Sequence, residues 1–337
     1  MNTHISSDSD PLGLGMLGFG GAGIGNLYRA MPDSKAIATL EAAWDSGIRY
    51  FDTAPHYGLG LSERRLGSVL QRKPRQEFVV STKVGRLLVP NHGVRTGDAP
   101  AGMAGMPDVP RDPEGFDVPA TSRRVWDFSE RGIRKSLEES LERLGLDQVD
   151  IAYLHDADVH DLEAGIRHGL PALEKLRSEG LVRAIGVGVN SAEAALASVE
   201  GASLDLVMLA GRYTLLEQPD VPLLERCMEK GTGVVNVGVY NSGLLARQEV
   251  PDDAHYNYGQ APHVQVVRAR ELAGICAGFG VELPTAALQF GLRHPAVVNV
   301  TVGATSPEQV RDNAARMAEE VPEELWTELS RRGLIPS

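Results

Sequence analysis

The stretch from Ile48 to Gly67 reads IRYFDTAPHYGLGLSERRLG, in which a short apolar run ends at the carboxylate of Asp52. Short apolar runs of this kind recur along the chain with helical segments between them, a pattern that is typical of βα units and a parallel sheet. The candidate strands are Leu17–Gly20, Ile48–Phe51, Phe78–Thr82, Val149–Leu154, Ala184–Val187, Leu206–Leu209, Val234–Val237 and Val297–Thr301. We therefore expect an α/β protein built as a (β/α)8 TIM barrel.

The segments between these runs carry helix start and stop signals. Ser34 is a candidate N-cap for a helix that ends at Gly47, and Ser129 is one for a helix that ends at Gly145. A side-chain oxygen at the N-cap accepts a hydrogen bond from a free backbone N–H group, and glycine readily adopts the left-handed conformation after the last turn. Each predicted helix leads within a few residues into the next strand.

Composition narrows the class of protein. The chain has 337 residues, of which 42% are hydrophobic, and its net charge of −12 argues against binding to nucleic acid or to anionic lipid. Cys227 and Cys276 are too few for a disulfide framework and lack zinc-ligand spacing, so no metal site is expected. The first ten residues do not resemble a signal peptide, and no segment approaches 18 uninterrupted apolar residues, so we expect a cytoplasmic protein without a membrane anchor.

Two stretches interrupt the strand–helix rhythm. Residues 86–124 are rich in Pro and Gly, and residues 247–263 set Tyr256, Asn257 and Tyr258 among Pro, Asp and Gly. Both are longer than usual connections, and loops that follow barrel strands line the active-site face. We expect a single barrel domain over residues 1–337 whose long loops shape a pocket, or alternatively form mobile surface segments.

Isolated polar residues follow several of the predicted strands. Asp52, Lys83 and His155 stand where the second, third and fourth apolar runs end, and Asn190, Tyr213 and Tyr240 follow the next three. In a closed parallel barrel the carboxyl ends of the strands meet at one mouth, where chemistry resides. A polar residue at one strand end is common, but a series of them indicates an active site.

The side chains of Asp52, Tyr57, Lys83 and His155 suit the interconversion of a carbonyl and an alcohol. An adjacent ammonium stabilises a phenolate, so Lys83 is expected to lower the pKa of Tyr57, and Asp52 would keep Lys83 charged. His155 could bind the reacting oxygen and orient the substrate. These four residues include no activated serine or cysteine, so an organic cofactor must carry the hydride.

The chain also resembles a known family. The segment Arg49–Gly67 resembles the aldo-keto reductase signature, in which an aspartate and a tyrosine lie five residues apart and Ser-Glu begins the next helix. Ser81-Thr-Lys83, Leu154-His155 and Gly186-Val-Gly-Val-Asn190 match the family in order and spacing, and the resemblance extends from Leu12 to about Met317. It implies a (β/α)8 barrel, an extended nicotinamide dinucleotide across the strand ends, Tyr57 as acid/base, and Asp52, Lys83 and His155 in support.

Three further segments narrow the resemblance. Phe19–Arg29, Ala210–Leu216 and Tyr240–Ala246 are similar to the branch of sugar dehydrogenases and pyridoxal 4-dehydrogenases. This implies oxidation of L-fucose or a related D-threo-aldose at C1 to a lactone, or of pyridoxal to 4-pyridoxolactone, with Tyr57 as base. The implied cofactor-binding residues are Gly21, Ala22, Asp52, Asn190, Tyr213, Tyr240, Ser242, Leu244, Gly303, Thr305, Gln309 and Asn313. Tyr28, His56 and Trp126 are expected to contact the substrate together with His155, or else to pack on the surface.

The chain departs from the family pattern at two places. Val189 and Ala210 stand where many members carry a serine and a glutamine that bind the nicotinamide, so Asn190 and Tyr213 must provide more of that contact, with Tyr213 stacked on the ring. NADP-dependent members place lysine and arginine at the positions of Gly303 and Gln309, where cations grip the extra phosphate. Both are absent, so NAD is expected in preference to NADP, although Arg311 could reach a phosphate.

Other interpretations compete with this one. The glycines from Gly18 to Gly23 fit the GxGxxG pattern of a Rossmann fold, but no helix opens on the last glycine. The chain could also be a regulatory barrel that binds a nucleotide with little turnover, or a barrel lyase or hydrolase that binds no dinucleotide. The sequence leaves the oligomeric state open.

Overall fold

A computed structural model describes residues 10–92, 110–257 and 259–336. Within these residues, parallel strands form a closed barrel in the order β1-β12-β9-β8-β7-β6-β3-β2. The strands are β1 (Leu17–Gly20), β2 (Tyr50–Asp52), β3 (Val79–Val84), β6 (Ile151–His155), β7 (Ala184–Val189), β8 (Leu206–Ala210), β9 (Gly233–Val237) and β12 (Val297–Gly303). Each of the eight predicted apolar runs coincides with one of these strands, which confirms the predicted (β/α)8 fold class.

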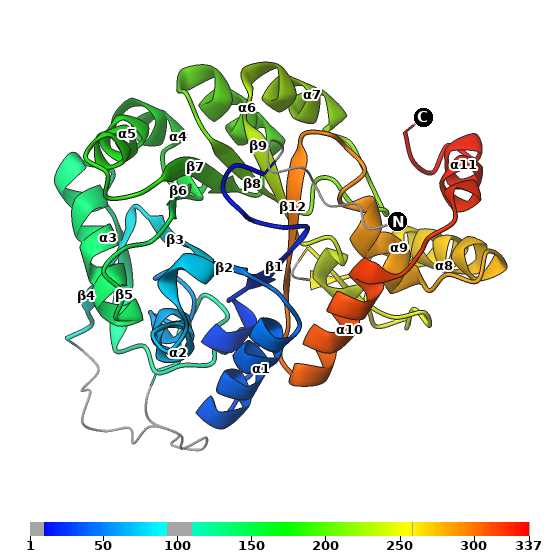
Figure 1. The fold of residues 1–337 in the computed structure, drawn as a ribbon, viewed down its shortest axis with the longest axis horizontal. Coiled ribbons are helices and arrows are strands. Elements are labelled where there is room, and N and C mark those ends of the chain that lie inside the picture. Colours follow the sequence, from blue (N-terminus) through cyan, green and yellow to red (C-terminus); the bar gives the residue numbers. More distant parts are fainter. Residues whose placement is uncertain (1–9, 93–109, 258, 337) are drawn as a thin grey trace. The chain divides into compact units, whose positions relative to one another are not determined.

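The chain contacts group the molecule into two compact units, which we describe separately and which can be followed in Figure 1. The first unit comprises the residues up to Gly188 together with Gly303–Arg311, and the second comprises Val189–Val302 and the residues from Asp312 onward. That residues 1–337 behave as a single domain stays a prediction.

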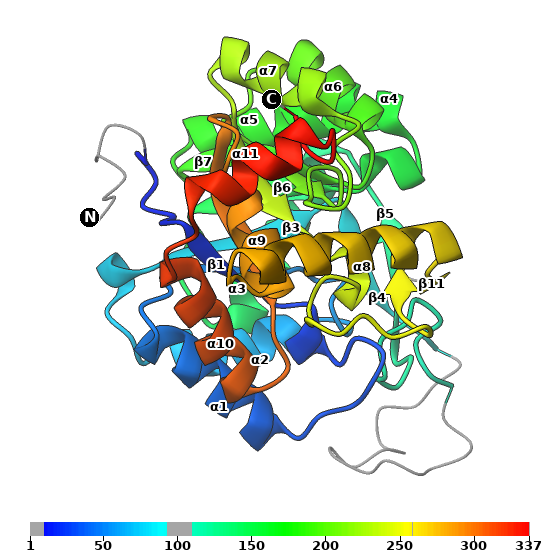
Figure 2. The same ribbon diagram turned by 90° about the vertical axis from the view of Figure 1, so that its right-hand side faces the viewer.

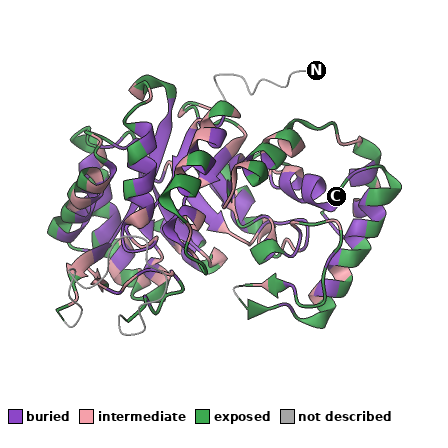
Figure 3. Cartoon of the chain, turned by 90° about the horizontal axis from the view of Figure 1, so that it is seen from below, coloured by how far each residue is buried: buried purple, intermediate pink, exposed green. Residues whose placement is uncertain are grey.

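In the first unit, parallel strands pair with helices packed beside them. β2 pairs with β3 through Phe51 and Val80, and β3 pairs with β6 through Thr82 and Ala152. The helices are α1 (Asp33–Asp45), α2 (Leu61–Leu70), α3 (Glu130–Leu144), α4 (Leu162–Ala164) and α5 (Leu170–Ser178), with short turns at η1 (Gly23–Gly25), η2 (Arg75–Glu77), η3 (Ala157–Val159) and η4 (Gly165–Gly169). Figure 3 shows the strands coloured as buried and the outer faces of the helices as exposed.

Of the two predicted helix caps in this unit, one was confirmed and one was wrong. The Ser129 hydroxyl accepts a hydrogen bond from the Gly132 N–H group at the start of α3, and Gly145 ends that helix with a φ of 60°. The cap predicted at Ser34 was wrong, because α1 already begins at Asp33 and Pro32 is its N-cap. The proline ring fixes φ near the value of −63° that this extended position needs, and its carbonyl accepts from the Lys35 N–H group.

The second unit holds the helices of the later part of the chain. They are α6 (Ala192–Gly201), α7 (Val221–Lys230), α8 (His263–Gly278), α9 (Leu283–Phe290) and α11 (Glu323–Arg331), with a short turn at η5 (Asn241–Gly243), while α10 (Pro307–Ala318) continues from one unit into the other. Figure 2 shows α8 beside α9 and α11, with which it packs. Among the described residues no single helix is long and apolar enough to cross a membrane, although the pair α8 and α9, bent by 100°, meets the criterion jointly.

Both long connections contain short strands. The ends of the 86–124 segment pair as an antiparallel ribbon of β4 (Arg86–Pro90) and β5 (Ser122–Trp126), in which Leu88 faces Arg124. Residues 93–109 of this segment, and Tyr258 of the other, lie outside the described residues. In the 247–263 segment, β10 (His255–Tyr256) pairs with β11 (Gly259–Gln260). The 86–124 segment is thus closed at its ends by pairing between residues distant in sequence, whereas the 247–263 segment contains a local hairpin.

Candidate active site

The first unit brings the four predicted catalytic side chains together. Asp52 and His155 are the last residues of β2 and β6, Lys83 lies near the end of β3, and Tyr57 follows β2 in the turn before α2. Because β2, β3 and β6 are adjacent and parallel, their carboxyl ends meet. Lys83 Nζ lies 2.5 Å from Asp52 Oδ2 and 3.0 Å from the Tyr57 hydroxyl.

Asp52 and Lys83 form a buried ion pair that is held from several sides. Ser81 Oγ donates to Asp52 Oδ1 at 2.7 Å, and Lys83 also donates to the carbonyl of Thr53 at 3.1 Å. Burial raises the pKa of Asp52, against the opposing effect of Lys83. Burial is the largest single effect and lowers the pKa of Lys83, but the charges and hydrogen bonds of Asp52 and Tyr57 together outweigh it and raise that pKa above its ordinary value. Lys83 is therefore a permanent cation beside the phenol.

Tyr57 is the candidate acid/base. Its ring lies 4.6 Å from Lys83 Nζ and 6.1 Å from the His155 ring, to which it is perpendicular. Burial raises the pKa of Tyr57 to about 12, and Lys83 pulls it down without reversing the shift. Lys83 therefore lowers the pKa of this phenol as expected, but the net pKa stays above its ordinary value because desolvation of the phenolate is the larger effect.

His155 is buried among cations. Burial, with the charges of Arg86 and Lys83, holds the pKa of His155 well below its usual range, so the imidazole is neutral. Nδ1 of His155 is buried and has no hydrogen-bond partner, whereas Nε2 lies 3.4 Å from Asp156 Oδ2. A neutral imidazole can donate one hydrogen bond without taking a proton from the substrate.

Of the predicted substrate residues, His56 lies closest to these side chains. Its ring is 5.4 Å from the His155 ring and 5.9 Å from the Tyr57 ring, and its Nδ1 is 3.3 Å from Arg86 Nη1. Burial, with the charges of Arg124 and Arg86, lowers the pKa of His56 to about 2. His56 is thus a second neutral imidazole beside the candidate acid/base.

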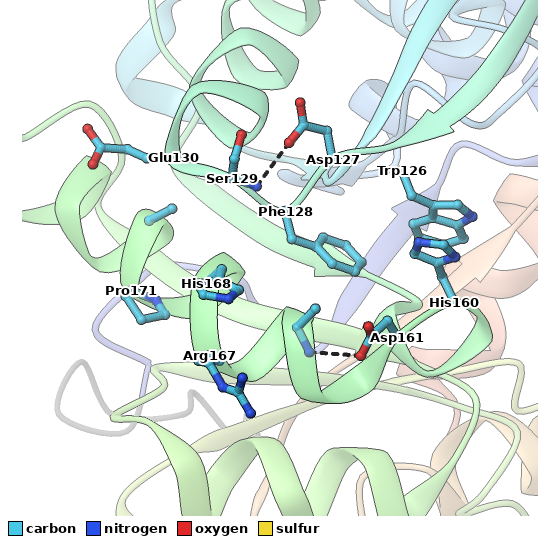
Figure 4. A pocket seen from close by; sticks show the side chains of 12 residues that line it. Trp126, Asp127, Phe128, Ser129, Glu130, His160, Asp161, Arg167, His168 and Pro171 are labelled. Atoms are coloured by element: carbon cyan, nitrogen blue, oxygen red, sulfur yellow. Dashed lines mark hydrogen bonds between the residues drawn. The ribbon is translucent and has the colours of Figure 1, made fainter.

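Trp126 and Tyr28 lie in different surroundings. The Arg86 guanidinium lies 4.1 Å from the centre of the Trp126 ring, and the His160 ring stacks on it at 5.2 Å. Figure 4 shows this stack at a pocket of about 700 Å³ that is also lined by Phe128 and Ser129. Tyr28 is 63% exposed. Contact of Trp126 and Tyr28 with a substrate stays a prediction, beside the alternative that they pack on the surface.

Two guanidinium–carboxylate pairs beside the site were not predicted from the sequence. Arg86 Nη2 lies 2.7 Å from Asp156 Oδ2, and both nitrogens of the Arg124 fork lie 2.6 Å from Asp112. Arg124 also donates to the His56 carbonyl at 2.8 Å. Asp156 adjoins His155 and could have been noticed, whereas nothing local marks Asp112.

The predicted cofactor residues of the first unit lie at the end of β1 and before α10. The Gly21 N–H group donates to the Asp52 carbonyl at 2.8 Å, and Ala22 precedes η1. A side chain at Gly23 would meet the Thr305 methyl group at 3.0 Å, so these two stretches touch. Gln309 Oε1 accepts from the Thr305 N–H group at 2.7 Å, and Gly303 is exposed.

The predicted cofactor residues of the second unit divide into three groups. The Tyr240 hydroxyl donates to Asn313 Oδ1 at 2.9 Å. Asn190 lines a pocket of about 430 Å³ beside the N-terminus of α6. Ser242 is exposed and Leu244 is buried.

Tyr213 lies in the interior of the second unit. It is 5% exposed, and its ring stacks on Phe290 at 4.9 Å. That Tyr213 stacks on a nicotinamide ring stays a prediction.

The residues present fit a nicotinamide dinucleotide. Exposed Gly303 and half-buried Thr305 and Ser306 lead into the N-terminus of α10, and free N–H groups at such a position favour phosphate. Lys83 and neutral His155 supply proton chemistry but no hydride donor or acceptor. Among residues 10–92, 110–257 and 259–336, no group of three His, Cys, Asp or Glu side chains could hold a metal ion.

Comparison with known proteins agrees with this site. The model of the aldo/keto reductase family matches residues 16–331. The chain is 52% identical to a D-threo-aldose 1-dehydrogenase from a Pseudomonas species, covering 100% of this chain and 99% of that protein. It is 39% identical to a pyridoxal 4-dehydrogenase from Microbacterium luteolum, covering 95% and 94%.

A solved structure supports the fold. The glycerol dehydrogenase from Gluconobacter oxydans superposes with a TM-score of 0.72 at 24% identity, covering 95% of this chain and 93% of that one. At this identity the likeness concerns the barrel alone. The family match over residues 16–331 and the relative of 52% identity show that the chain belongs to the aldo/keto reductase family.

Proposed function

We propose that this protein is an NAD-dependent dehydrogenase that oxidises the C1 hemiacetal hydroxyl of L-fucose or a related D-threo-aldose to the lactone. The observation that carries the proposal is the contact chain from Asp52 through Lys83 Nζ to the Tyr57 hydroxyl, with distances of 2.5 and 3.0 Å. The substrate class is supported by the relative of 52% identity, a D-threo-aldose 1-dehydrogenase.

In this reaction the chain handles the proton. Tyr57 removes the proton of the C1 hydroxyl as the C–H bond breaks, and Lys83 stabilises the phenolate that must form beforehand. Asp52 holds Lys83 in place and balances its charge. Neutral His155 donates a hydrogen bond to the reacting oxygen and orients it. A nicotinamide dinucleotide, when bound, accepts the hydride.

The preference for NAD is supported by the residues around the N-terminus of α10. Gln309 offers a carbonyl oxygen that already accepts from the Thr305 N–H group, and neighbouring Glu308 adds a negative charge. Arg311 Nη1 lies 3.9 Å from Glu308, so the nearby cation is partly compensated. A 2′-phosphate would meet no fixed cation in this segment.

A second candidate is the oxidation of pyridoxal to 4-pyridoxolactone, favoured by the relative of 39% identity. The chemistry is the same, because pyridoxal also presents a cyclic hemiacetal hydroxyl. Arg86 and Arg124 are each paired with a carboxylate, so neither offers an uncompensated charge to a phosphate ester. This favours substrates that, like both candidates, carry no phosphate.

A panel of substrates separates these possibilities. L-fucose, D-arabinose, L-galactose, D-glucose and pyridoxal are tested with NAD and with NADP, and reduced nicotinamide is followed by absorbance. We expect the highest kcat/KM with a D-threo-aldose and NAD. Turnover with pyridoxal alone would support the second candidate. Dinucleotide binding without turnover of any substrate would support a regulatory barrel, and a preference for NADP above about tenfold would contradict the cofactor assignment.

A further inference from the structure

Three buried hydroxyl groups lie along the strands that carry Asp52, Lys83 and His155. Each belongs to the residue two positions before one of these side chains, so it lies on the same face of its strand. The three residues are Tyr50 on β2, Ser81 on β3 and Tyr153 on β6, and each is 0% exposed. None of these hydroxyl groups exchanges a proton in the reaction proposed above.

The hydroxyl groups form a chain of hydrogen bonds that ends on Asp52. The Tyr153 and Tyr50 hydroxyl oxygens are 3.2 Å apart, and the Tyr50 oxygen lies 3.0 Å from Ser81 Oγ. Ser81 Oγ donates to Asp52 Oδ1 at 2.7 Å, whereas Asp52 Oδ2 accepts from Lys83 Nζ at 2.5 Å. Each oxygen of this buried carboxylate thus has its own donor.

The number of hydrogens fixes the direction of this hydroxyl chain. A carboxylate only accepts hydrogen bonds, so the single hydrogen of the Ser81 hydroxyl points to Asp52. Ser81 then has only lone pairs to offer, and Tyr50 must donate to it. For the same reason Tyr153 must donate to Tyr50. Three hydroxyl dipoles are therefore aligned towards the negative charge, an arrangement in which each hydrogen bond strengthens the next.

The far end of the hydroxyl chain is closed. Within the part of the protein that the structure describes, the Tyr153 hydroxyl has no hydrogen-bond partner except Tyr50. If Asp52 were protonated and donated to Ser81, every hydroxyl group would turn, and the hydrogen of Tyr153 would be left in the core without an acceptor. An unpaired buried donor is unfavourable. The closed end therefore favours the carboxylate form of Asp52.

Asp52 needs such donors because its surroundings oppose a charge. Burial raises the pKa of Asp52, and the charge of Lys83, with hydrogen bonds from Lys83 and Ser81, opposes that rise. A carboxyl group held by donors to its charged form keeps its proton less readily. The other titratable groups that interact with Asp52 are the phenols of Tyr50, Tyr57 and Tyr153.

We propose that the hydroxyl chain of Tyr153, Tyr50 and Ser81 positions Asp52 and keeps it ionised, so that Lys83 remains charged beside Tyr57. A protonated Asp52 would no longer compensate the buried ammonium group, and the phenolate would lose its stabilising cation. Because the hydroxyl chain ends in the core rather than at solvent, it acts on the charge of Asp52 and does not carry protons away. This inference rests on the proposed function, since it assumes that Tyr57 acts as base.

Carbon NMR of the Asp52 carboxyl group, in protein labelled at its aspartates, measures this charge without turnover. The signal is assigned by its loss in Asp52→Asn. Ser81→Ala removes the donor to Oδ1 and should favour protonation of Asp52 by about tenfold or more. Tyr50→Phe keeps that donor but no longer polarises it, so the effect should be about two- to threefold. Tyr153→Phe acts one step further away and should have the smallest effect, below about twofold.

Two further variants separate this role from a disturbance of packing. Tyr50→Phe combined with Tyr153→Phe leaves no hydroxyl group of the hydroxyl chain unpaired next to Ser81, and should change the Asp52 titration as much as Tyr50→Phe alone. It replaces Ser81→Ala if that variant does not fold. Ser198 is the matched control, because it is 1% exposed and its Oγ donates at 2.7 Å to a backbone carbonyl. Ser198→Ala should leave the Asp52 titration unchanged.

The pH profile of oxidation provides a second readout. We expect kcat to fall more steeply below the pH at which Asp52 takes up its proton, and this pH should be about one unit higher in Ser81→Ala, with little change in KM for NAD. An Asp52 signal that titrates alike in Ser81→Ala and in the unmodified protein would overturn the inference, as would equal effects of Tyr153→Phe and Ser81→Ala. Failure of the unmodified protein to turn over aldoses or pyridoxal would instead contradict the proposed function, while the NMR titrations would still test the hydroxyl chain.

Discussion

The hydroxyl group of the half-buried Tyr57 lies 3.0 Å from the charged ammonium group of Lys83. In Tyr57→Phe the phenyl ring keeps its packing but loses the group that exchanges the proton. We expect kcat to fall by about 10² to 10⁴. Dinucleotide affinity, measured by fluorescence titration, should change little. Activity close to that of the unmodified protein would contradict the role of Tyr57 as base.

The pKa of Tyr57 makes oxidation depend on pH. Because burial raises this pKa to about 12, only a small fraction of the phenol is deprotonated near neutrality. The fraction of phenolate grows by about tenfold per pH unit below the pKa, so kcat/KM for oxidation should rise as the pH increases from about 7 to 10. A profile that is flat over this range would show that Tyr57 does not act from its protonated resting state.

At the level of helices and strands, α2 packs closely on α3. The turn that carries Tyr57 leads directly into α2. A side chain at Gly67 in α2 would lie 2.0 Å from the Leu144 carbonyl in α3. Gly67→Ala should therefore destabilise the protein by about 1–3 kcal/mol in urea unfolding, because backbone atoms must separate.

Gly274 in α8 provides the control for this change. A side chain there would meet no atom within 4 Å. Gly274→Ala should leave stability unchanged or raise it by up to about 1 kcal/mol, since alanine loses less entropy in a helix. Equal effects of the two substitutions would contradict the close packing of α2 on α3.

Stability of the whole molecule should depend on pH through its buried imidazoles. The folded-state pKa of His56 is lowered to about 2, whereas in an unfolded chain it is near the ordinary value of 6.5. The unfolded state therefore binds the proton first, so the contribution of this neutral imidazole to stability is lost as the pH falls below about 6.5. The loss amounts to about 1.4 kcal/mol per pH unit.

A comparison of variants isolates this contribution. The free energy of unfolding of the His56→Gln variant should fall less steeply between about pH 6.5 and 5 than that of the unmodified protein, by about 1.4 kcal/mol per unit. Other groups, including Asp156, whose pKa burial raises to about 6, affect both proteins alike. Exposed His168 serves as the control, and identical slopes for the His56→Gln and His168→Gln variants would refute the assignment.

Strands and helix caps differ in how well the sequence predicted them. The eight apolar runs were correct because strand formation there depends on a local pattern, and the ends of those runs already marked Asp52, Lys83 and His155. The Ser129 cap was correct for the same reason. The Ser34 cap failed because a proline two residues earlier also satisfies the requirements of a helix start.

What the sequence by itself determined is the barrel, its family and the four candidate catalytic side chains, because each depends on neighbouring residues and their spacing. Only the tertiary structure decided that Arg86 reaches Asp156, that Tyr213 packs on Phe290, and that burial outweighs Lys83 in setting the pKa of Tyr57. The physical reason is that ion pairing and desolvation depend on side chains that are distant along the chain and are brought together only by folding.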